Sequence, residues 1–255
     1  MNVSPSADPF DVCITVDLEP DCPPYLWTWR GLEEGAPALL ALLAEEGVRA
    51  TYFTTGDTAQ KYPDAVRSLV SAGHELACHG MTHRPFPELD ENTAAWEIGR
   101  SAELLREFAT VTSFRAPYLR FPNRLLPLLE ANGFTLDSSQ AKYKVYPTSA
   151  PSRHFQRVPA SMTSSVLRFP SLLRDPILLC LRSPVILFVH PWEFVDLTNE
   201  KLRWDCRFRT GRVALECLRS VVQLFKHKGA TFRCMNELVG LPKMGNRELR
   251  PTVAV

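Results

Sequence analysis

Residues 65–83 read AVRSLVSAGHELACHGMTH, and this stretch contains the unit from which we infer the fold. Residues 65–72 have the apolar spacing of a helix, Gly73 follows them, and residues 74–78 form a short apolar run. A glycine just past a helix takes the left-handed conformation without steric cost, and the next strand can then pack beside the strand before the helix. The stretch therefore predicts a helix, a turn and a buried strand, in this order.

The same pattern of helix, glycine and strand occurs four times in the chain. The predicted pairs are 39–46 with 49–53, 65–72 with 74–78, 125–132 with 134–137, and 213–228 with 230–233. Further strands are expected at 11–16, 113–115 and 185–189, and a further helix at 92–108. This alternation predicts an α/β protein, and about seven parallel strands favour a distorted parallel (β/α) barrel. No glycine-rich phosphate loop follows the first strand, which removes the main support for a nucleotide-binding sheet.

The length and charge of the chain limit its organisation and partners. In 255 residues we expect one domain over residues 11–240, a flexible N-terminal segment 1–10 and a C-terminal tail 241–255. The chain has 29 Lys and Arg against 28 Asp and Glu, so we expect no nucleic-acid partner.

Cysteine usage and apolar stretches indicate a location. The seven cysteines include no C-x-x-C pair and several lie in apolar runs, which favours a reducing compartment. Residues 1–12 lack the charged and apolar regions of a secretory signal, so we expect a cytoplasmic protein. The most apolar stretch, 176–189, is interrupted by Arg182 and Pro184 and is too short to cross a bilayer. No transmembrane segment is therefore expected.

Residues with reactive side chains stand where the predicted strands end. They are Asp17, Glu19, His79, His83, Arg115, Asp137 and His190. Because the carboxyl ends of barrel strands meet at one mouth, we expect these side chains to lie together. The segment 140–171 is rich in Ser, Pro and Arg with weak periodicity, and we expect it to form irregular hairpins over this mouth.

His79 and His83 are spaced for metal binding. Two imidazoles four residues apart can share one face of a helical turn, and a carboxylate at a strand end can complete a three-ligand site with open positions. Such a site is typical of catalysis, since a structural site would fill all positions with protein. An Fe(II) oxygenase also uses two His and one carboxylate, but the parallel βα pattern disfavours that fold. Gly80 stands where the H-E-x-x-H motif needs glutamate, which argues against a thermolysin-type protease.

Five motifs in order carry a family resemblance: TVDLE at 15–19, HGMTH at 79–83, RAPY at 115–118, LDSS at 136–139 and LFVHPW at 187–192. Together they resemble the NodB-homology domain of the polysaccharide deacetylase family, carbohydrate esterase family 4, over about residues 11–240. The resemblance implies a metal-dependent hydrolase that removes an N-acetyl or N-formyl group from an amino sugar or related amide. Its partner would be a small-molecule or glycan substrate carrying an N-acyl group.

The first motif departs from the commonest family form, which has two adjacent Asp residues. Here it reads Asp17-Leu18-Glu19, so we expect Glu19 to complete the metal site with His79 and His83, and Asp21 is the alternative ligand. The cofactor expected is a divalent metal, zinc first, although cobalt, manganese, nickel or iron also suit this ligand set. Bound in this way, the metal would lower the pKa of its water and polarise the substrate carbonyl.

The remaining motif residues receive roles from the resemblance and from their chemistry. We expect Asp17 to be the general base, and Arg115 offers a planar fork to orient it. His190 is the candidate general acid, with Asp137 as the acidic neighbour expected to hold its proton. The backbone N–H of Tyr118 would stabilise the oxyanion by resemblance to the family, and Trp192 could stack on a sugar or pack in the core.

Other functions remain open at this point. An amidohydrolase that opens a cyclic imide or ureide would use the same fold, and a catalytically idle carbohydrate-binding barrel is a third class. The apolar run 167–181 invites a lipid-linked sugar, although a buried core segment is the favoured interpretation. The sequence is compatible with a monomer and with a homo-oligomer.

Overall fold

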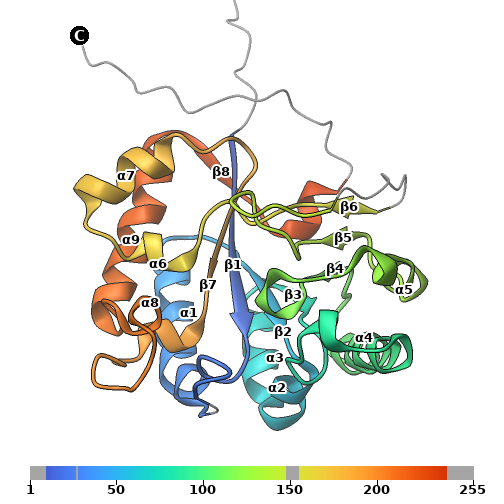
Figure 1. Cartoon of the computed structure of the whole chain (residues 1–255). Helices are drawn as coiled ribbons and strands as arrows, with labels where there is room; N and C mark the ends of the chain where they lie inside the picture. Colours follow the sequence, from blue (N-terminus) through green and yellow to red (C-terminus); the bar gives the residue numbers. More distant parts are fainter. Residues whose placement is uncertain (1–9, 27, 148–154, 240–255) are drawn as a thin grey trace, which may run out of the picture.

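The computed structural model describes residues 10–26, 28–147 and 155–239. The predicted segment 1–10, except Phe10, and the predicted tail 241–255 lie outside these ranges. The described chain is built around one parallel sheet (Figure 1). Its strands are β1 (Phe10–Leu18), β2 (Thr51–Thr54), β3 (Glu75–Cys78), β4 (Ser113–Phe114), β5 (Leu136–Asp137), β6 (Gln156–Arg157), β7 (Val185–Val189) and β8 (Ala230–Phe232).

The strand order makes the sheet a distorted barrel. The order is β6-β5-β4-β3-β2-β1-β7, with β8 also paired to β1, and every pairing is parallel. The gap between β6 and β7 is bridged by the segment 160–162, where Ser161 N–H donates to Ile186 O at 2.7 Å and Met162 pairs with Leu187. The prediction of a distorted parallel barrel with about seven strands is confirmed, with β6 as an additional short strand.

The expectation of irregular hairpins in 140–171 is wrong for the described part of that segment. Instead, β6 joins the sheet in parallel register with β5, pairing Leu136 with Gln156 and Asp137 with Arg157. The segment then continues into α6 and α7. Its strand pairs through the backbone rather than through an apolar pattern, which is why the sequence did not predict it.

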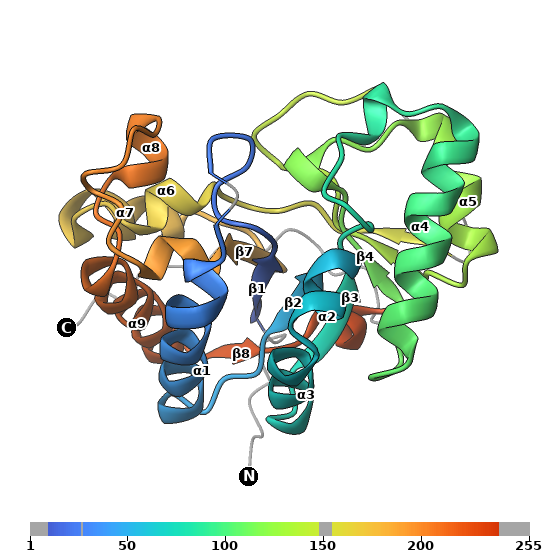
Figure 2. The ribbon, with the colours of Figure 1, turned by 90° about the horizontal axis from the view of Figure 1, so that it is seen from below.

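Helices cover the outside of the curved sheet (Figures 1 and 2). They are α1 (Ala36–Glu45), α2 (Gly56–Lys61), α3 (Pro63–Ser71), α4 (Glu91–Arg106), α5 (Leu126–Ala131), α6 (Ser164–Leu167), α7 (Ser171–Leu179), α8 (Trp204–Arg207) and α9 (Arg212–His227). Single-turn helices connect them: η1 (Gly31–Gly35), η2 (Phe86–Glu88), η3 (Pro117–Leu119), η4 (Asn123–Leu125), η5 (Pro191–Phe194) and η6 (Met235–Leu238). Within the described residues, no helix is long and apolar enough to span a membrane.

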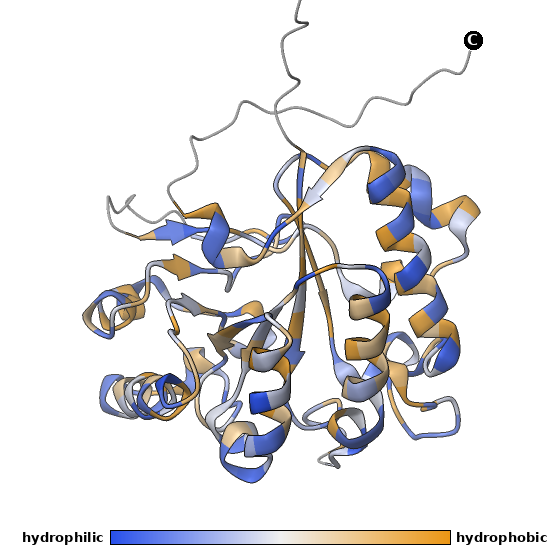
Figure 3. Ribbon diagram, turned by 180° about the vertical axis from the view of Figure 1, so that it is seen from behind, coloured by the Kyte–Doolittle hydropathy of each residue, from blue (hydrophilic) through white to orange (hydrophobic). Residues whose placement is uncertain are grey.

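The helix, glycine and strand units form as predicted. The four glycines after the helices have positive φ, from 60° at Gly47 to 81° at Gly73, a conformation that glycine adopts without strain. Helix α9 shows why these helices pack: its buried residues recur every three or four positions and face the sheet, while the other face is polar. Figure 3 shows the same division, with largely hydrophobic strands and helices of mixed colour around them.

The alternation along β1 positions the functional residues. All nine of its residues are buried, because the even-numbered side chains pack under the helices and the odd-numbered ones face the barrel interior. Cys13 lies in the apolar interior, and Thr15 and Asp17 follow on the same side. Asp17 therefore reaches the carboxyl end of the barrel from inside.

Candidate active site

The predicted site residues meet at the carboxyl ends of the strands, the end seen in Figure 2. Asp17 and Glu19 come from β1 and its end, His79 and His83 follow β3, Arg115 follows β4 and His190 follows β7. These side chains are buried or nearly so. Segments up to 173 residues apart in sequence therefore contribute to one cluster, as expected for a barrel mouth.

Glu19, His79 and His83 form the group suited to a metal ion. The Oε2 atom of Glu19 lies 3.2 Å from His79 Nε2 and 2.6 Å from His83 Nε2, and the three ligand atoms lie within 4.8 Å of one another. The other ring nitrogen of His79, Nδ1, lies 2.7 Å from the backbone oxygen of Arg115. That bond makes Nδ1 the donor and leaves the Nε2 lone pair facing Glu19, which is the arrangement common for a metal-binding histidine. The donor set thus fits a divalent cation.

The charge of this group is also suited to a cation. Burial alone would raise the pKa of Glu19, but the charge of His83 and the close contacts of Glu19 with both histidines hold it well below its usual value. Asp21 does not join this group: its carboxylate accepts bonds from Thr28 Oγ1 at 2.6 Å and from the Gly31 N–H at 2.9 Å. The structure therefore brings Glu19, rather than Asp21, to the two histidines.

The segment from His79 to His83 is a loop, so the expected helical turn is wrong. Gly80 has φ of 78° and His83 has φ of 58°, both left-handed. Glu97 of α4 holds this loop: its Oε2 accepts the N–H groups of Met81 at 2.8 Å and Thr82 at 2.9 Å, and its other oxygen accepts the Thr82 hydroxyl. The two imidazoles therefore meet because a buried carboxylate shapes the loop.

Asp17 and Arg115 form the buried pair that the sequence predicted. Arg115 is fully buried and donates to Asp17 Oδ1 at 2.6 Å and to Thr15 Oγ1 at 2.8 Å. Its guanidinium also lies 4.1 Å from the ring centre of Phe53 and donates to Ser138 Oγ at 3.0 Å. One oxygen of Asp17 is thereby fixed in place, and the other, Oδ2, lies 3.9 Å from His190 Nε2.

His190 is held by an acidic residue that the sequence analysis missed. Its Nδ1 lies 2.7 Å from Glu193 Oε1, and Glu193 in turn lies 3.1 Å from Arg168 Nε. Burial lowers the pKa of His190, but the hydrogen bond to Glu193 and the charges of nearby carboxylates raise it to about 9. The signal was present in His190-Pro-Trp-Glu193, where an acid three residues on can fold back in a single helical turn.

Asp137 does not hold His190, and that prediction is wrong. Its carboxylate lies 2.8 Å from Arg157 Nε and accepts the Ser139 N–H at 2.9 Å. Arg157 is the residue that pairs with Asp137 in register between β5 and β6. Asp137 therefore stabilises the pairing of β5 with β6 and does not position the imidazole of His190.

The two aromatic candidates lie beside the histidines. Tyr118 is 37% exposed, has φ of 61°, and its ring centre lies 4.9 Å from that of His83. Trp192 is only 5% exposed and its ring stacks on His190 at 4.7 Å. Of the two, Tyr118 offers a surface to a ligand, whereas Trp192 supports the imidazole of His190.

The comparison with known families decides the classification. The sequence profile of the polysaccharide deacetylase family matches residues 6–136, half of the chain. The chain belongs to the polysaccharide deacetylase family. This match includes Asp17, Glu19, both metal-site histidines and Arg115, but it ends before His190 and Glu193.

Curated relatives carry deacetylase names. The peptidoglycan deacetylase of Helicobacter pylori is 30% identical over 115 residues, which cover 43% of this chain and 39% of that protein. A chitooligosaccharide deacetylase of Sinorhizobium fredii is 38% identical over 88 residues, which cover 32% of this chain and 40% of that protein. The alignments thus span about two fifths of the length of these relatives.

Solved structures share the deacetylase fold. A family 4 carbohydrate esterase from Streptomyces lividans, in complex with acetate, has a TM-score of 0.63 and 20% identity, covering 91% of this chain and 95% of that one. A family 4 pseudoenzyme from Bacillus anthracis has a TM-score of 0.62 and 14% identity, covering 91% of this chain and 66% of that one. Because an esterase and a pseudoenzyme share the fold, activity must be argued from the residues at the mouth.

Proposed function

We propose that this protein is a divalent-metal-dependent hydrolase that removes the N-acetyl group from an amino sugar of a glycan. One observation carries the proposal: the Glu19, His79 and His83 group lies beside two further buried pairs, Asp17 with Arg115 and His190 with Glu193. The metal ligands, the general base and the general acid that an amide hydrolase needs would therefore lie together. Family membership and the names of the relatives support the N-acetyl sugar as substrate.

The metal site would be provided by Glu19, His79 and His83, with zinc as the proposed ion. When bound, the ion would supply Lewis acidity and lower the pKa of a water. The protein's contribution is the fixed geometry: the bond from His79 Nδ1 to Arg115 O and the hold of Glu97 on the loop orient the ligands before any ion binds.

Asp17 acts as the general base. Arg115 occupies its Oδ1, so Oδ2 is the oxygen available to take the proton of the attacking water. Thr15 and Phe53 fix the guanidinium from two sides, which keeps the carboxylate aimed at the mouth. The base is thus positioned without depending on the substrate.

His190 acts as the general acid and gives its proton to the departing nitrogen. Its raised pKa keeps the imidazole charged near neutral pH, since Glu193 stabilises the imidazolium. The backbone N–H of Tyr118, whose ring lies against His83, is the proposed donor to the oxyanion. The acid, the base and the oxyanion donor then come from three different strand ends.

The test combines metal analysis with product release. Purified protein should contain a divalent metal and release acetate from N-acetylated oligosaccharides, while His79→Ala and His83→Ala should lose both properties. His227→Ala, an exposed histidine on α9, is the matched control and should lose neither. The panel also includes N-formyl sugars and cyclic imides and ureides, and oxygen uptake is recorded. Turnover of a cyclic amide alone, or oxygen consumption, would replace the proposed reaction with another one.

A further inference from the structure

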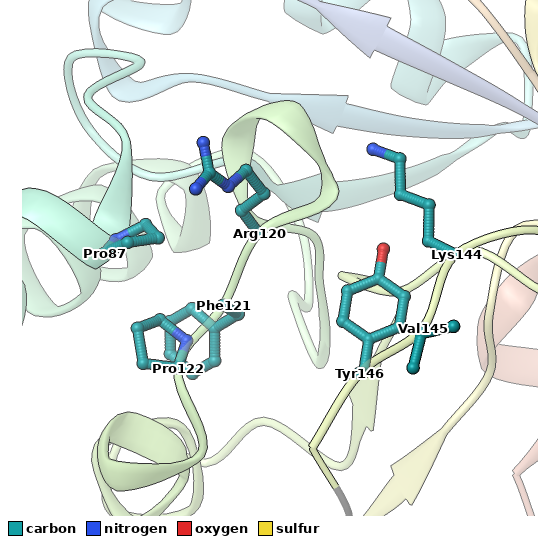
Figure 4. A pocket seen from close by; sticks show the side chains of 7 residues that line it. All are labelled: Pro87, Arg120, Phe121, Pro122, Lys144, Val145 and Tyr146. Atoms are coloured by element: carbon teal, nitrogen blue, oxygen red, sulfur yellow. The ribbon is translucent and has the colours of Figure 1, made fainter.

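A pocket of about 320 Å³ lies among residues of the segments that follow His83 and Tyr118 (Figure 4). Its apolar wall is made of Pro87, Phe121 and Pro122, and Tyr146 lies opposite. Arg120 and Lys144 provide the only charges that line it among the described residues. Figure 4 shows both long side chains on the same side of the pocket, with the hydroxyl of Tyr146 directed between them.

The pocket is connected to the active site by short stretches of chain. Arg120 lies two residues after Tyr118, whose ring contacts His83, and Pro87 lies four residues after His83. Tyr146 ties the two walls together, because its hydroxyl donates to Leu119 O at 3.0 Å. A glycan bound with one sugar at the metal site would therefore extend a neighbouring unit toward this pocket.

The residue before Lys144 is a tyrosine, Tyr143. Tyr143 is 44% exposed, so its ring is open to a ligand. The residue next to it in sequence, Lys144, then lines the pocket itself.

The two cations of the pocket lack acidic partners in the described structure. No carboxylate of the described ranges forms an ion pair with Arg120 or Lys144, and this includes Glu88, which follows the lining residue Pro87. Residues 138–174 contain no Asp or Glu and six Lys and Arg. Four of these six are committed elsewhere: Lys142 donates to the Pro184 carbonyl, Arg157 pairs with Asp137, and Arg168 and Arg174 are buried.

An unpaired arginine and lysine above an apolar wall suit one class of ligand. A guanidinium matches the oxygens of a carboxylate or phosphate, and an ammonium adds a point charge. The flat apolar wall suits the C–H face of a sugar ring. Burial and the charge of Arg120 lower the pKa of Lys144, so an anion placed between the two cations would relieve their repulsion.

We propose that this pocket is an anion subsite that binds a carboxylate or phosphate carried by the sugar next to the N-acetylated unit. The inference rests on the proposed function and narrows its substrate class to acidic glycans. The two sources differ in chemistry: a carboxylate belongs to a uronic acid within the chain, whereas a phosphate belongs to a sugar phosphate at its end.

Kinetics with matched substrates test the subsite. The first substrate is a neutral N-acetylated oligosaccharide. The second is an oligosaccharide of the same length with a uronic acid next to the N-acetylated unit, and the third is one of the same length that ends in a sugar phosphate. The parent should prefer at least one anionic substrate, and Arg120→Gln or Lys144→Gln should reduce the ratio of anionic to neutral kcat/KM by about tenfold, the loss expected for one charge-assisted hydrogen bond. Lys201→Gln removes an exposed charge outside the pocket and should leave the ratio unchanged. The preferred anionic substrate identifies the source.

A binding measurement separates this inference from the proposed function. Glucuronic acid, glucose 1-phosphate and glucose are titrated into the labelled protein, and the amide signals of Phe121 and Val145 are followed by NMR. An anionic sugar should shift them at concentrations where glucose does not, and both Gln variants should weaken that response. Equal responses to all three sugars, or no loss in the variants, would overturn the subsite even if acetate is released. Absence of acetate release with intact anion binding would instead overturn the proposed reaction and the link between the pocket and a glycan substrate.

Discussion

Glu193 holds the imidazole of His190 with its Oε1 atom 2.7 Å from Nδ1, and both residues belong to the same helical turn. The carboxylate is itself buried and paired with Arg168. Burial opposes its ionisation, but the charges of Arg168 and His190 hold its pKa below the usual value. The pair therefore stabilises the charged form of His190, which is the form that a general acid requires.

Replacing Glu193 should move the pH dependence of activity. His190 has its pKa raised to about 9, so the acid is present below that pH and is lost as the pH rises through it. In Glu193→Gln a neutral amide no longer stabilises the imidazolium, and the alkaline limb of kcat/KM should move to lower pH by about one unit or more. Any bound metal acts on parent and variant alike, so the difference between their profiles reports on Glu193.

Asp137→Asn is the matched control for this experiment. Asp137 is equally buried, but it pairs with Arg157 across the strand and not with His190. Its loss should lower the stability of the sheet edge and leave the alkaline limb in place. If the alkaline limb of kcat/KM moved equally in Glu193→Gln and Asp137→Asn, both carboxylates would act through the net negative charge around the site. The bond from Glu193 to His190 would then not be the cause.

Asp17→Asn should separate chemistry from metal binding. The amide can still accept from Arg115 but cannot take a proton, so kcat should fall by about 10²-fold or more while the metal content stays at the parent level. Asp11→Asn, at the opposite end of β1 and paired with Arg233 at 2.7 Å, should affect stability only. Loss of metal in Asp17→Asn would make Asp17 a ligand and remove it from the role of base.

Glu19→Gln and Asp21→Asn should have different metal contents. Glu19 lies against both histidines, so its substitution should release the ion, which elemental analysis after gel filtration would detect. Asp21 bonds to Thr28 and Gly31, so its substitution should keep the ion and lower the free energy of unfolding by about 1 kcal/mol. The reverse result would assign the ligand to Asp21.

The fold could be predicted from the sequence because its units are local. The predicted strand at 74–78 is β3 (Glu75–Cys78), since a capped amphipathic helix and a buried apolar run leave a clear pattern. The strand β6 could not be predicted in this way. Its two residues, Gln156 and Arg157, are polar, and the backbone bonds from Gln156 N–H to Thr135 O and from Val158 N–H to Asp137 O hold it in the sheet.

The sequence predicted most of the residues that form the site, but not the contacts between them. Strand ends bring Asp17, Glu19, His79 and His190 together in any parallel barrel, so their meeting follows from the fold. Which acid would hold His190 depends on a single turn at Pro191–Phe194, and spacing alone could not rank Glu193 above Asp137. The loop between His79 and His83 is likewise shaped by a residue of another helix, which leaves no mark in the motif itself.

That residue, Glu97, gives the last prediction. Its carboxylate accepts the N–H groups of Met81 and Thr82 from within α4, so it positions the loop that carries both metal-site histidines without touching substrate. Glu97→Ala leaves these buried donors without their acceptor and should weaken metal affinity by roughly 10- to 100-fold, the usual cost of losing such a supporting group. Titration against a chelator measures this loss, and activity should recover when metal is added in excess.

Two further variants show whether Glu97 acts by positioning the loop. Glu97→Gln keeps a carbonyl oxygen for the two N–H groups, so its metal affinity should lie close to that of the parent. Glu103→Ala removes an exposed carboxylate from the same helix, which pairs with Arg100, and should change neither affinity nor activity. The contrary result would be a Glu97→Ala variant that binds metal with normal affinity but is inactive even in excess metal. Glu97 would then affect the reaction without positioning the metal ligands.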